Sequence, residues 1–176
     1  MESQRQKRAR LATKWACYIG LLILAATLQT MPGLLTVGGA KPLFILPLCM
    51  AVALFEEEYT GALFGAVGGL LWDYTAGRTA GLLALNLLIL CFAAALVEQL
   101  YLQNKLSNYV MLTTGAAFVA LNGDFLFFYA MREYPGAGTH YVSTLLPTLV
   151  FTAVLCPAAF YAVRAVWRRW GQPAGI

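Results

Sequence analysis

The sequence is poor in charged residues, which make up 11% of its 176 positions, and poor in residues that carry hydrolytic chemistry. It has one histidine, His140, and three serines, Ser3, Ser107 and Ser143. None of these serines lies in an apolar segment with a histidine base in reach, which argues against a hydrolytic triad. We therefore predict that the protein is not an enzyme.

Cysteine is also scarce, and its spacing carries no chemistry. The four cysteines lie singly in different apolar segments, at Cys17, Cys49, Cys91 and Cys156. Without C-x-x-C spacing they indicate neither a metal site nor a disulfide framework. We interpret them as small apolar packing residues and expect no metal and no cofactor.

Hydrophobic residues, in contrast, make up 60% of the chain. Several apolar runs approach the roughly 20 residues that cross a bilayer as a helix. In hydrocarbon every backbone group must be satisfied within helices or a closed barrel, and continuous rather than alternating hydrophobicity favours helices. The sequence predicts an all-α integral membrane protein with a single transmembrane domain over residues 1–176.

Six transmembrane helices are predicted, with short basic tails at 1–14 and 167–176. The predicted spans cover residues 16–35, 42–55, 59–72, 81–97, 109–131 and 141–166. A signal peptide is the alternative for the first span, although that span exceeds the ~7 to 15 apolar residues typical of a signal. The second and third spans are short for a bilayer of about 30 Å, so they thin the bilayer, are sheltered by other helices, or form a re-entrant hairpin.

The basic residues predict the orientation. With the amino terminus inside, nine Lys and Arg side chains are cytoplasmic and three are outside, which fits the positive-inside bias. Five spans would instead export Arg164, Arg168 and Arg169, so we predict six spans with both termini cytoplasmic. The net charge of +4 comes from the tails, and we expect these to bind anionic lipid at the cytoplasmic face rather than nucleic acid.

Polar residues inside the predicted spans form a candidate site. Three glutamates, Glu56 to Glu58, mark a surface turn after the second span. Other polar side chains fall in the outer half of the membrane or at its outer edge, on four different helices. They are able to converge there, and Arg78 or Arg132 is a possible charge partner. Alternatively they form a hydrogen-bonded network that only locks the helices, which is the interpretation we favour. This predicted outer cluster comprises Gln29, Asp73, Asn86, Asn122 and Asp124.

The most distinctive stretch is GALFGAVGGLLWDYTAGRTAG, residues 61–81. Its glycines recur at G-x-x-x-G and G-x-x-G spacings, which give one side of a helix a surface that another backbone can approach closely in lipid. We expect this stretch to pack against a partner helix. The residues assigned to this packing are Gly61, Gly65, Gly68, Gly69, Gly77 and Gly81.

The same stretch resembles a known family. Pro42 leads into a short span, and the frame G-x7-GLLWD-x3-G-x3-GLLAL begins at Gly61 and includes Asp73 and Ala84. This pattern is similar to the rod shape-determining protein MreD, as are the length and the basic amino terminus.

The resemblance implies a non-enzymatic subunit of the bacterial elongation machinery in the plasma membrane. Such a subunit works with MreC, and connects MreB filaments to the peptidoglycan synthase RodA and its transpeptidase partner. The family is also similar to the six-helix substrate-binding component of energy-coupling-factor vitamin transporters. A vitamin-binding component is therefore the alternative function, with the outer cluster as its site.

Overall fold

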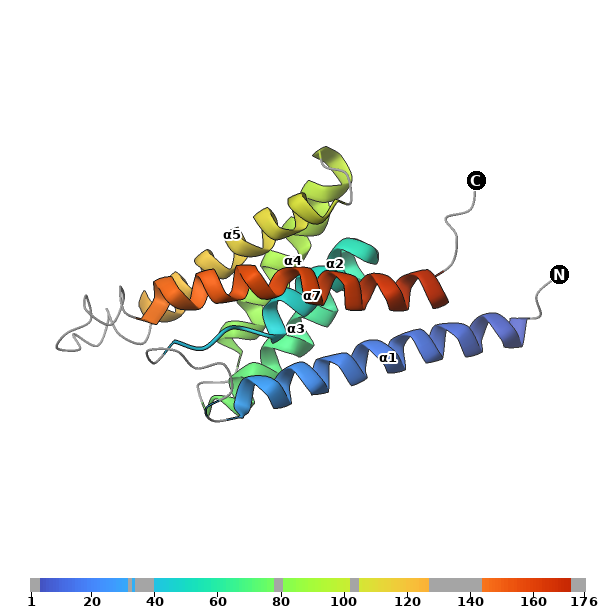
Figure 1. The fold of residues 1–176 in the computed structure, drawn as a ribbon. Helices are drawn as coiled ribbons and strands as arrows, with labels where there is room; N and C mark the ends of the chain where they lie inside the picture. The colour runs from blue at the N-terminus through green and yellow to red at the C-terminus, as the bar shows by residue number, and fades with distance from the viewer. Residues whose placement is uncertain are drawn as a thin grey trace.

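The computed structural model describes residues 4–31, 33, 40–77, 81–101, 105–126 and 144–171. This part of the chain forms a helical bundle (Figure 1). Its helices are α1 (Gln4–Thr30), α2 (Ile45–Phe55), α3 (Glu58–Thr75), α4 (Leu82–Tyr101), α5 (Leu106–Phe125) and α7 (Leu146–Trp170).

Each predicted span coincides with one of these six helices, although the boundaries differ. Helix α1 begins well before the predicted span at residue 16, because Gln, Lys, Arg and Ala all favour helix and carry it through the basic segment. It ends at Thr30, before the predicted end at residue 35. The predicted ends at 34–35 and 127–131, and the predicted start at 141–143, lie outside the described residues.

Within the described residues, three helical segments are long and apolar enough to cross a membrane: Lys7–Thr30, Leu82–Tyr101 and Leu146–Trp170. These segments support a helical membrane protein. Crossing by all six helices stays a prediction.

Helix α2 lies at the centre of the bundle. It has 11 residues, or roughly 16 Å at the usual helical rise, which is about half of a bilayer's hydrocarbon core. Every residue from Ile45 to Leu54 is buried, and α2 contacts α1, α3, α4, α5 and α7. One of the outcomes predicted for this short segment was that other helices would shelter it, and the structure shows this arrangement for α2. Pro47 lies in the first turn, where its missing N–H costs little.

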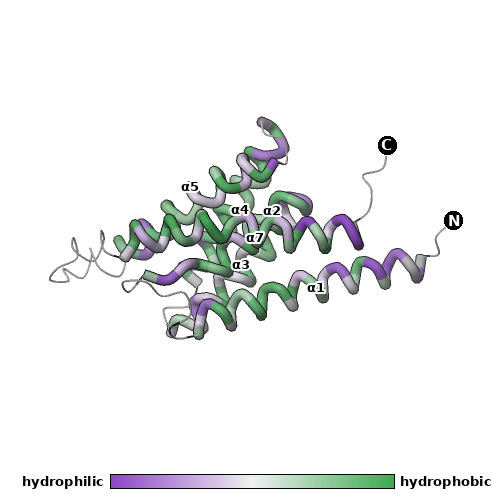
Figure 2. Tube along the Cα trace, viewed as in Figure 1, coloured by the Kyte–Doolittle hydropathy of each residue, from purple (hydrophilic) through white to green (hydrophobic). Residues whose placement is uncertain are grey.

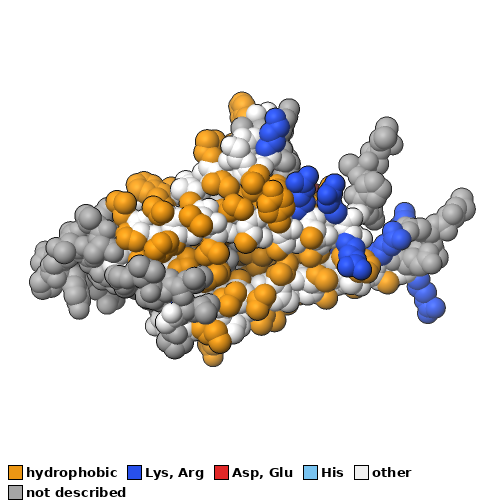
Figure 3. Space-filling view, viewed as in Figure 1, with side chains coloured by type: hydrophobic (Ala, Val, Ile, Leu, Met, Phe, Trp, Pro, Cys, Tyr) orange, Lys and Arg blue, Asp and Glu red, His pale blue; other side chains and the backbone are white. Residues whose placement is uncertain are grey.

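Large side chains from several helices fill the core around α2. Phe160 of α7 lies with its ring centroid 5.3 Å from Phe55 and 5.2 Å from Tyr109 of α5. Most of α1 and α7 beyond their basic ends is apolar (Figure 2), and apolar side chains of these helices lie on the surface, as a lipid-facing protein requires (Figure 3). Because lipid exerts no hydrophobic drive between helices, close packing and polar contacts must hold them together.

Different helix ends lie at the two ends of the bundle. The beginning of α1 and the end of α7 lie at one end, which we call the inner end (Figure 1). The end of α1 and the beginning of α7 lie at the opposite, outer end. These names follow the predicted orientation, which itself stays a prediction.

Candidate functional site

Four glycines of α3 make close contacts with helices of the same chain. A Cβ built on Gly61 would lie 2.5 Å from Ala53 Cα of α2, and one on Gly65 would lie 2.9 Å from the Leu87 carbonyl oxygen of α4. A Cβ on Gly69 would lie 2.6 Å from the carbonyl oxygen of Leu83. The glycines therefore allow α3 to approach α2 and α4 closely.

In the structure, helices of the same chain cover these four positions, and packing against a partner helix stays a prediction. Gly61, Gly65, Gly68 and Gly69 are all buried, and Gly68 contacts Cys49 of α2. A second protein reaches these positions only if α2 or α4 moves away. The neighbours that the spacing predicted are helices of this chain.

Gly77 and Gly81 belong to the turn after α3 and not to a helical face. Their φ angles are +62° and +109°, in the region that side chains rarely adopt, and a Cβ on either would meet no atom within 4 Å. Asp73, which is 1% exposed, accepts a 2.8 Å hydrogen bond at Oδ2 from the Gly81 N–H. This bond joins the end of α3 to the start of α4. Arg78, the predicted charge partner of Asp73, lies outside the described residues, as does Arg132.

Gln29 holds the first turn of α2. Its Oε1 accepts hydrogen bonds from the backbone N–H groups of Phe44 and Ile45, at 3.0 and 3.1 Å. Those N–H groups have no partner within α2, because the first turn of a helix leaves its donors unsatisfied. The Leu43 N–H is bound in turn by Thr152 Oγ1 of α7, at 3.1 Å. Gln29, like Asp73, therefore accepts hydrogen bonds from backbone N–H groups.

A polar cavity of about 380 Å³ lies at the outer end of the bundle. Of the five residues predicted to form the outer cluster, it brings together Gln29 and Asp124. Lys41 also lines it and donates a hydrogen bond to the Met31 carbonyl oxygen. The lining residues are Gln29, Lys41, Pro42, Leu43, Trp72, Leu121, Asp124, Phe125, Thr144, Leu145 and Thr148.

The two asparagines of the predicted cluster do not line this cavity. Asn122 donates a 2.8 Å hydrogen bond to the Phe118 carbonyl oxygen one turn earlier in α5. The Asn86 side chain lies beside Gly123, where a Cβ would come 3.4 Å from its Nδ2. With Asp73 bound at the α3–α4 turn, the cluster is divided among separate contacts.

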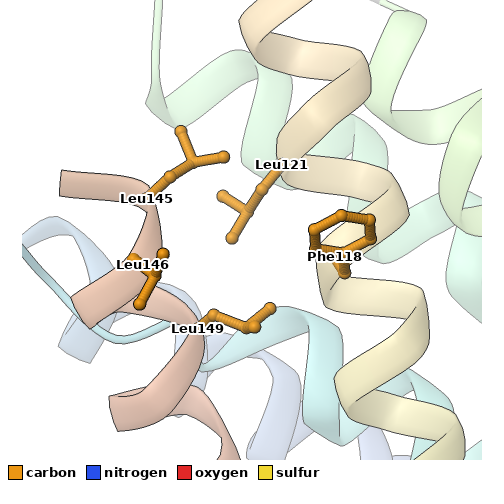
Figure 4. A pocket seen from close by; sticks show the side chains of 5 residues that line it. All are labelled: Phe118, Leu121, Leu145, Leu146 and Leu149. Carbon is orange, nitrogen blue, oxygen red and sulfur yellow. The ribbon is translucent and has the colours of Figure 1, made fainter. Parts of the chain in front are cut away.

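A smaller recess between α5 and the start of α7 adjoins the cavity (Figure 4). It has a volume of about 80 Å³, and its lining side chains are Phe118, Leu121, Leu145, Leu146 and Leu149. Without a polar lining side chain it offers no group to orient a ligand. Leu121 and Leu145 line both spaces, so they lie at the border between the apolar recess and the outer cavity.

At the inner end, Lys14 of α1 forms a buried ion pair with Glu56. Lys14 Nζ lies 2.7 Å from Glu56 Oε2, and the two side chains are 8% and 11% exposed. The Tyr18 hydroxyl donates to Glu56 Oε1 at 2.9 Å. The sequence pattern predicted Glu56 in a surface turn and Lys14 as a charge of the basic tail, and it did not predict this network. The spacing of Lys14 and Tyr18, one helical turn apart beside an acidic turn, is the feature that would have indicated it.

The other two glutamates of the turn are more exposed. Gln99 Nε2 of α4 donates a 2.8 Å hydrogen bond to Glu58 Oε2. This bond, with a further one from the Glu58 backbone N–H, lowers the pKa of the Glu58 carboxyl. Glu57 is exposed, as predicted for a surface turn.

The outer cavity carries groups that are suited to binding. Within the described residues no group of three His, Cys, Asp or Glu side chains is placed to hold a metal ion. The outer cavity offers an amide, a carboxylate, an ammonium group and an indole ring, which are groups that orient a bound segment or ligand.

Comparison with known protein families identifies a match over most of the chain. A family model described as rod shape-determining protein MreD matches residues 9–164. No curated protein and no solved structure matches the chain.

Proposed function

Because the chain belongs to the MreD family, we propose that it is a non-enzymatic assembly subunit of the bacterial elongation machinery that binds an MreC-like membrane protein. Membership of the family implies a role in rod-shape determination. The proposal adds the partner, the plasma-membrane location and a contribution to lateral peptidoglycan synthesis. MreB, RodA and its transpeptidase partner are further candidate partners, reached through the MreC-like protein.

The observation that supports this function most directly is the outer cavity. Lys41 and Asp124 bring opposite charges to it, and Gln29 and Trp72 add an amide and an aromatic surface. A segment of a partner that follows its own membrane helix would meet the cavity at the membrane edge. The glycine surface of α3, in contrast, is already covered by α2 and α4. We therefore place partner docking at the cavity.

Capture of an MreC-like protein tests this proposal. The change is Asp124→Ala, and its matched control is Glu57→Ala, which removes a carboxylate at the opposite end of the bundle. We expect Asp124→Ala to reduce the amount of MreC-like protein that co-purifies at matched membrane levels, and Glu57→Ala to leave it unchanged. Equal capture by both variants would place the docking surface elsewhere.

The same cavity supports a second candidate function, a vitamin-binding component. Its volume of about 380 Å³ falls within the roughly 300 to 1,000 Å³ of small-molecule pockets. Such a ligand would raise the thermal midpoint of the purified protein with concentration, by mass action. We expect no saturable shift with any vitamin. A saturable shift that Asp124→Ala abolishes, without a loss of partner capture, would favour the vitamin-binding function instead.

A further inference from the structure

An apolar groove of about 260 Å³ runs between α1 and α7, with α2 as its floor. Leu21, Leu24 and Ala25 line it from α1, and Ala158, Ala159 and Ala162 line it from α7. The alanines of α7 keep the groove open where larger residues would close it. We call this space the α1–α7 groove.

The size and lining of the groove favour a single hydrocarbon chain. A methylene is similar in size to a water molecule, which occupies about 30 Å³, so the groove holds roughly nine such groups. Three turns of a helix with a diameter near 10 Å would occupy on the order of 1,200 Å³. The groove is too small to enclose a partner helix, and its lining offers no polar side chain to a polar ligand.

Basic residues continue the two walls of the groove toward the inner end. Arg169 lies seven residues beyond Ala162, and Arg10 lies fourteen before Leu24, so the helical repeat places each on nearly the same face as its groove residue. Both side chains are exposed. Figure 3 shows Lys and Arg side chains gathered at this end, beyond the apolar surface of α1 and α7.

The spacing along α1 matches the dimensions of one lipid leaflet. Arg10 and Leu21 are eleven residues apart, which is roughly 16 Å along a helix. Half of a hydrocarbon core of about 30 Å is roughly 15 Å. A lipid with its phosphate beside Arg10 therefore reaches the groove with the end of its acyl chain.

We propose that the α1–α7 groove binds one acyl chain of an anionic phospholipid of the inner leaflet, whose phosphate lies between Arg10 and Arg169. The apolar lining takes the chain, and the two guanidinium groups select the negative headgroup. This inference is independent of the proposed function, because it uses neither the outer cavity nor a protein partner.

The experiment compares phospholipids that remain bound to the intact chain after purification in mild detergent. The first variant is Ala158→Phe, which fills the groove, and its matched control is Ala93→Phe, at an exposed alanine of a separate groove between α4 and α5. Mass spectrometry of the extracted lipid gives the amount bound per chain. We expect Ala158→Phe to lose the lipid that the unmodified chain and Ala93→Phe retain.

A second measurement tests the headgroup without altering the groove. Phosphatidylglycerol and phosphatidylcholine with identical acyl chains are titrated onto the purified protein, and the rise in thermal midpoint reports binding. We expect phosphatidylglycerol to bind more tightly, and Arg169→Gln to weaken phosphatidylglycerol binding about fivefold but phosphatidylcholine binding less, because the choline cation already offsets the charge of that phosphate.

Three results would overturn the proposal. One is equal lipid retention by the unmodified chain, Ala158→Phe and Ala93→Phe. Another is equal affinity for the two headgroups in the unmodified chain. The third is that the unmodified chain purifies without lipid but with another membrane protein, and that Ala158→Phe loses this protein. That result would identify the occupant of the groove as a partner helix.

Discussion

At the scale of single residues, the Lys14–Glu56 pair shows how a charge near a membrane acquires a structural role. Glu56 accepts from both Lys14 and Tyr18, so its two oxygens are satisfied although its side chain is largely buried. The pair joins α1 to the turn between α2 and α3. Removing one partner should destabilise the fold far more than replacing both, because an unpaired buried charge costs much more than a buried pair contributes.

We predict that Lys14→Met lowers the free energy of unfolding by about 3 kcal/mol, because it leaves Glu56 buried without a counter-charge. The double variant Lys14→Met with Glu56→Leu should recover most of this loss. Reversible unfolding in detergent measures both. The single variant Glu56→Leu completes the comparison. If the double variant loses as much free energy of unfolding as the two single variants added together, the Glu56 carboxylate is already solvated and the pair is only a surface contact.

Gly69 gives the second prediction at this scale. A methyl group there meets the backbone of Leu83 and Ala84, so Gly69→Ala should cost about 1 to 3 kcal/mol by overpacking α3 against α4. The control is Gly115→Ala in α5, where a Cβ meets nothing within 4 Å. The thermal midpoint in detergent should fall for Gly69→Ala and stay level or rise for Gly115→Ala. The opposite order would mean that the α3–α4 contact is looser than described.

At the scale of helices, α2 depends on contacts from outside itself. Its first backbone donors are bound by Gln29 of α1, as a side chain at a helix N-cap would bind them. We predict that Gln29→Ala destabilises the protein by about 1 to 2 kcal/mol, because buried donors lose their acceptor. The control is Gln99→Ala, whose hydrogen bond to Glu58 is exposed. Equal thermal midpoints for the two variants would contradict a capping role.

The helices were predictable because continuous apolar runs must hide their backbone within helices. The burial of α2 was only one of several predicted outcomes, because its cause lies in helices far away in the sequence, including Thr152 of α7. The glycine spacing predicted a close helix contact, but it carries no information on whether the neighbour belongs to the same chain. Gln29 and Asp124 share a cavity only because of how α1 and α5 are rotated, which the residues alone do not determine.

At the scale of the whole molecule, the positions of the helices agree with an even number of crossings. The start of α1 and the end of α7 lie at the same end of the bundle (Figure 1). We predict that reporters fused at Met1 and Ile176 both report the cytoplasm, because the basic residues of the two tails favour that side. A reporter fused at His140 should report the opposite side. An active periplasmic reporter at Ile176 would contradict six spans.

The enclosure of α2 also bears on how the chain is made. As the ribosome delivers helices in order, α2 enters the membrane with a helical length of only about half a hydrocarbon core, and the non-helical residues 41–44 before it carry backbone groups that lipid cannot satisfy. Gln29 is already present at that moment, but Thr152, which binds the Leu43 N–H, arrives only with the last helix. A nascent chain that stops before α7 therefore keeps an unsatisfied donor just before α2, and this donor is satisfied only when α7 packs against α2.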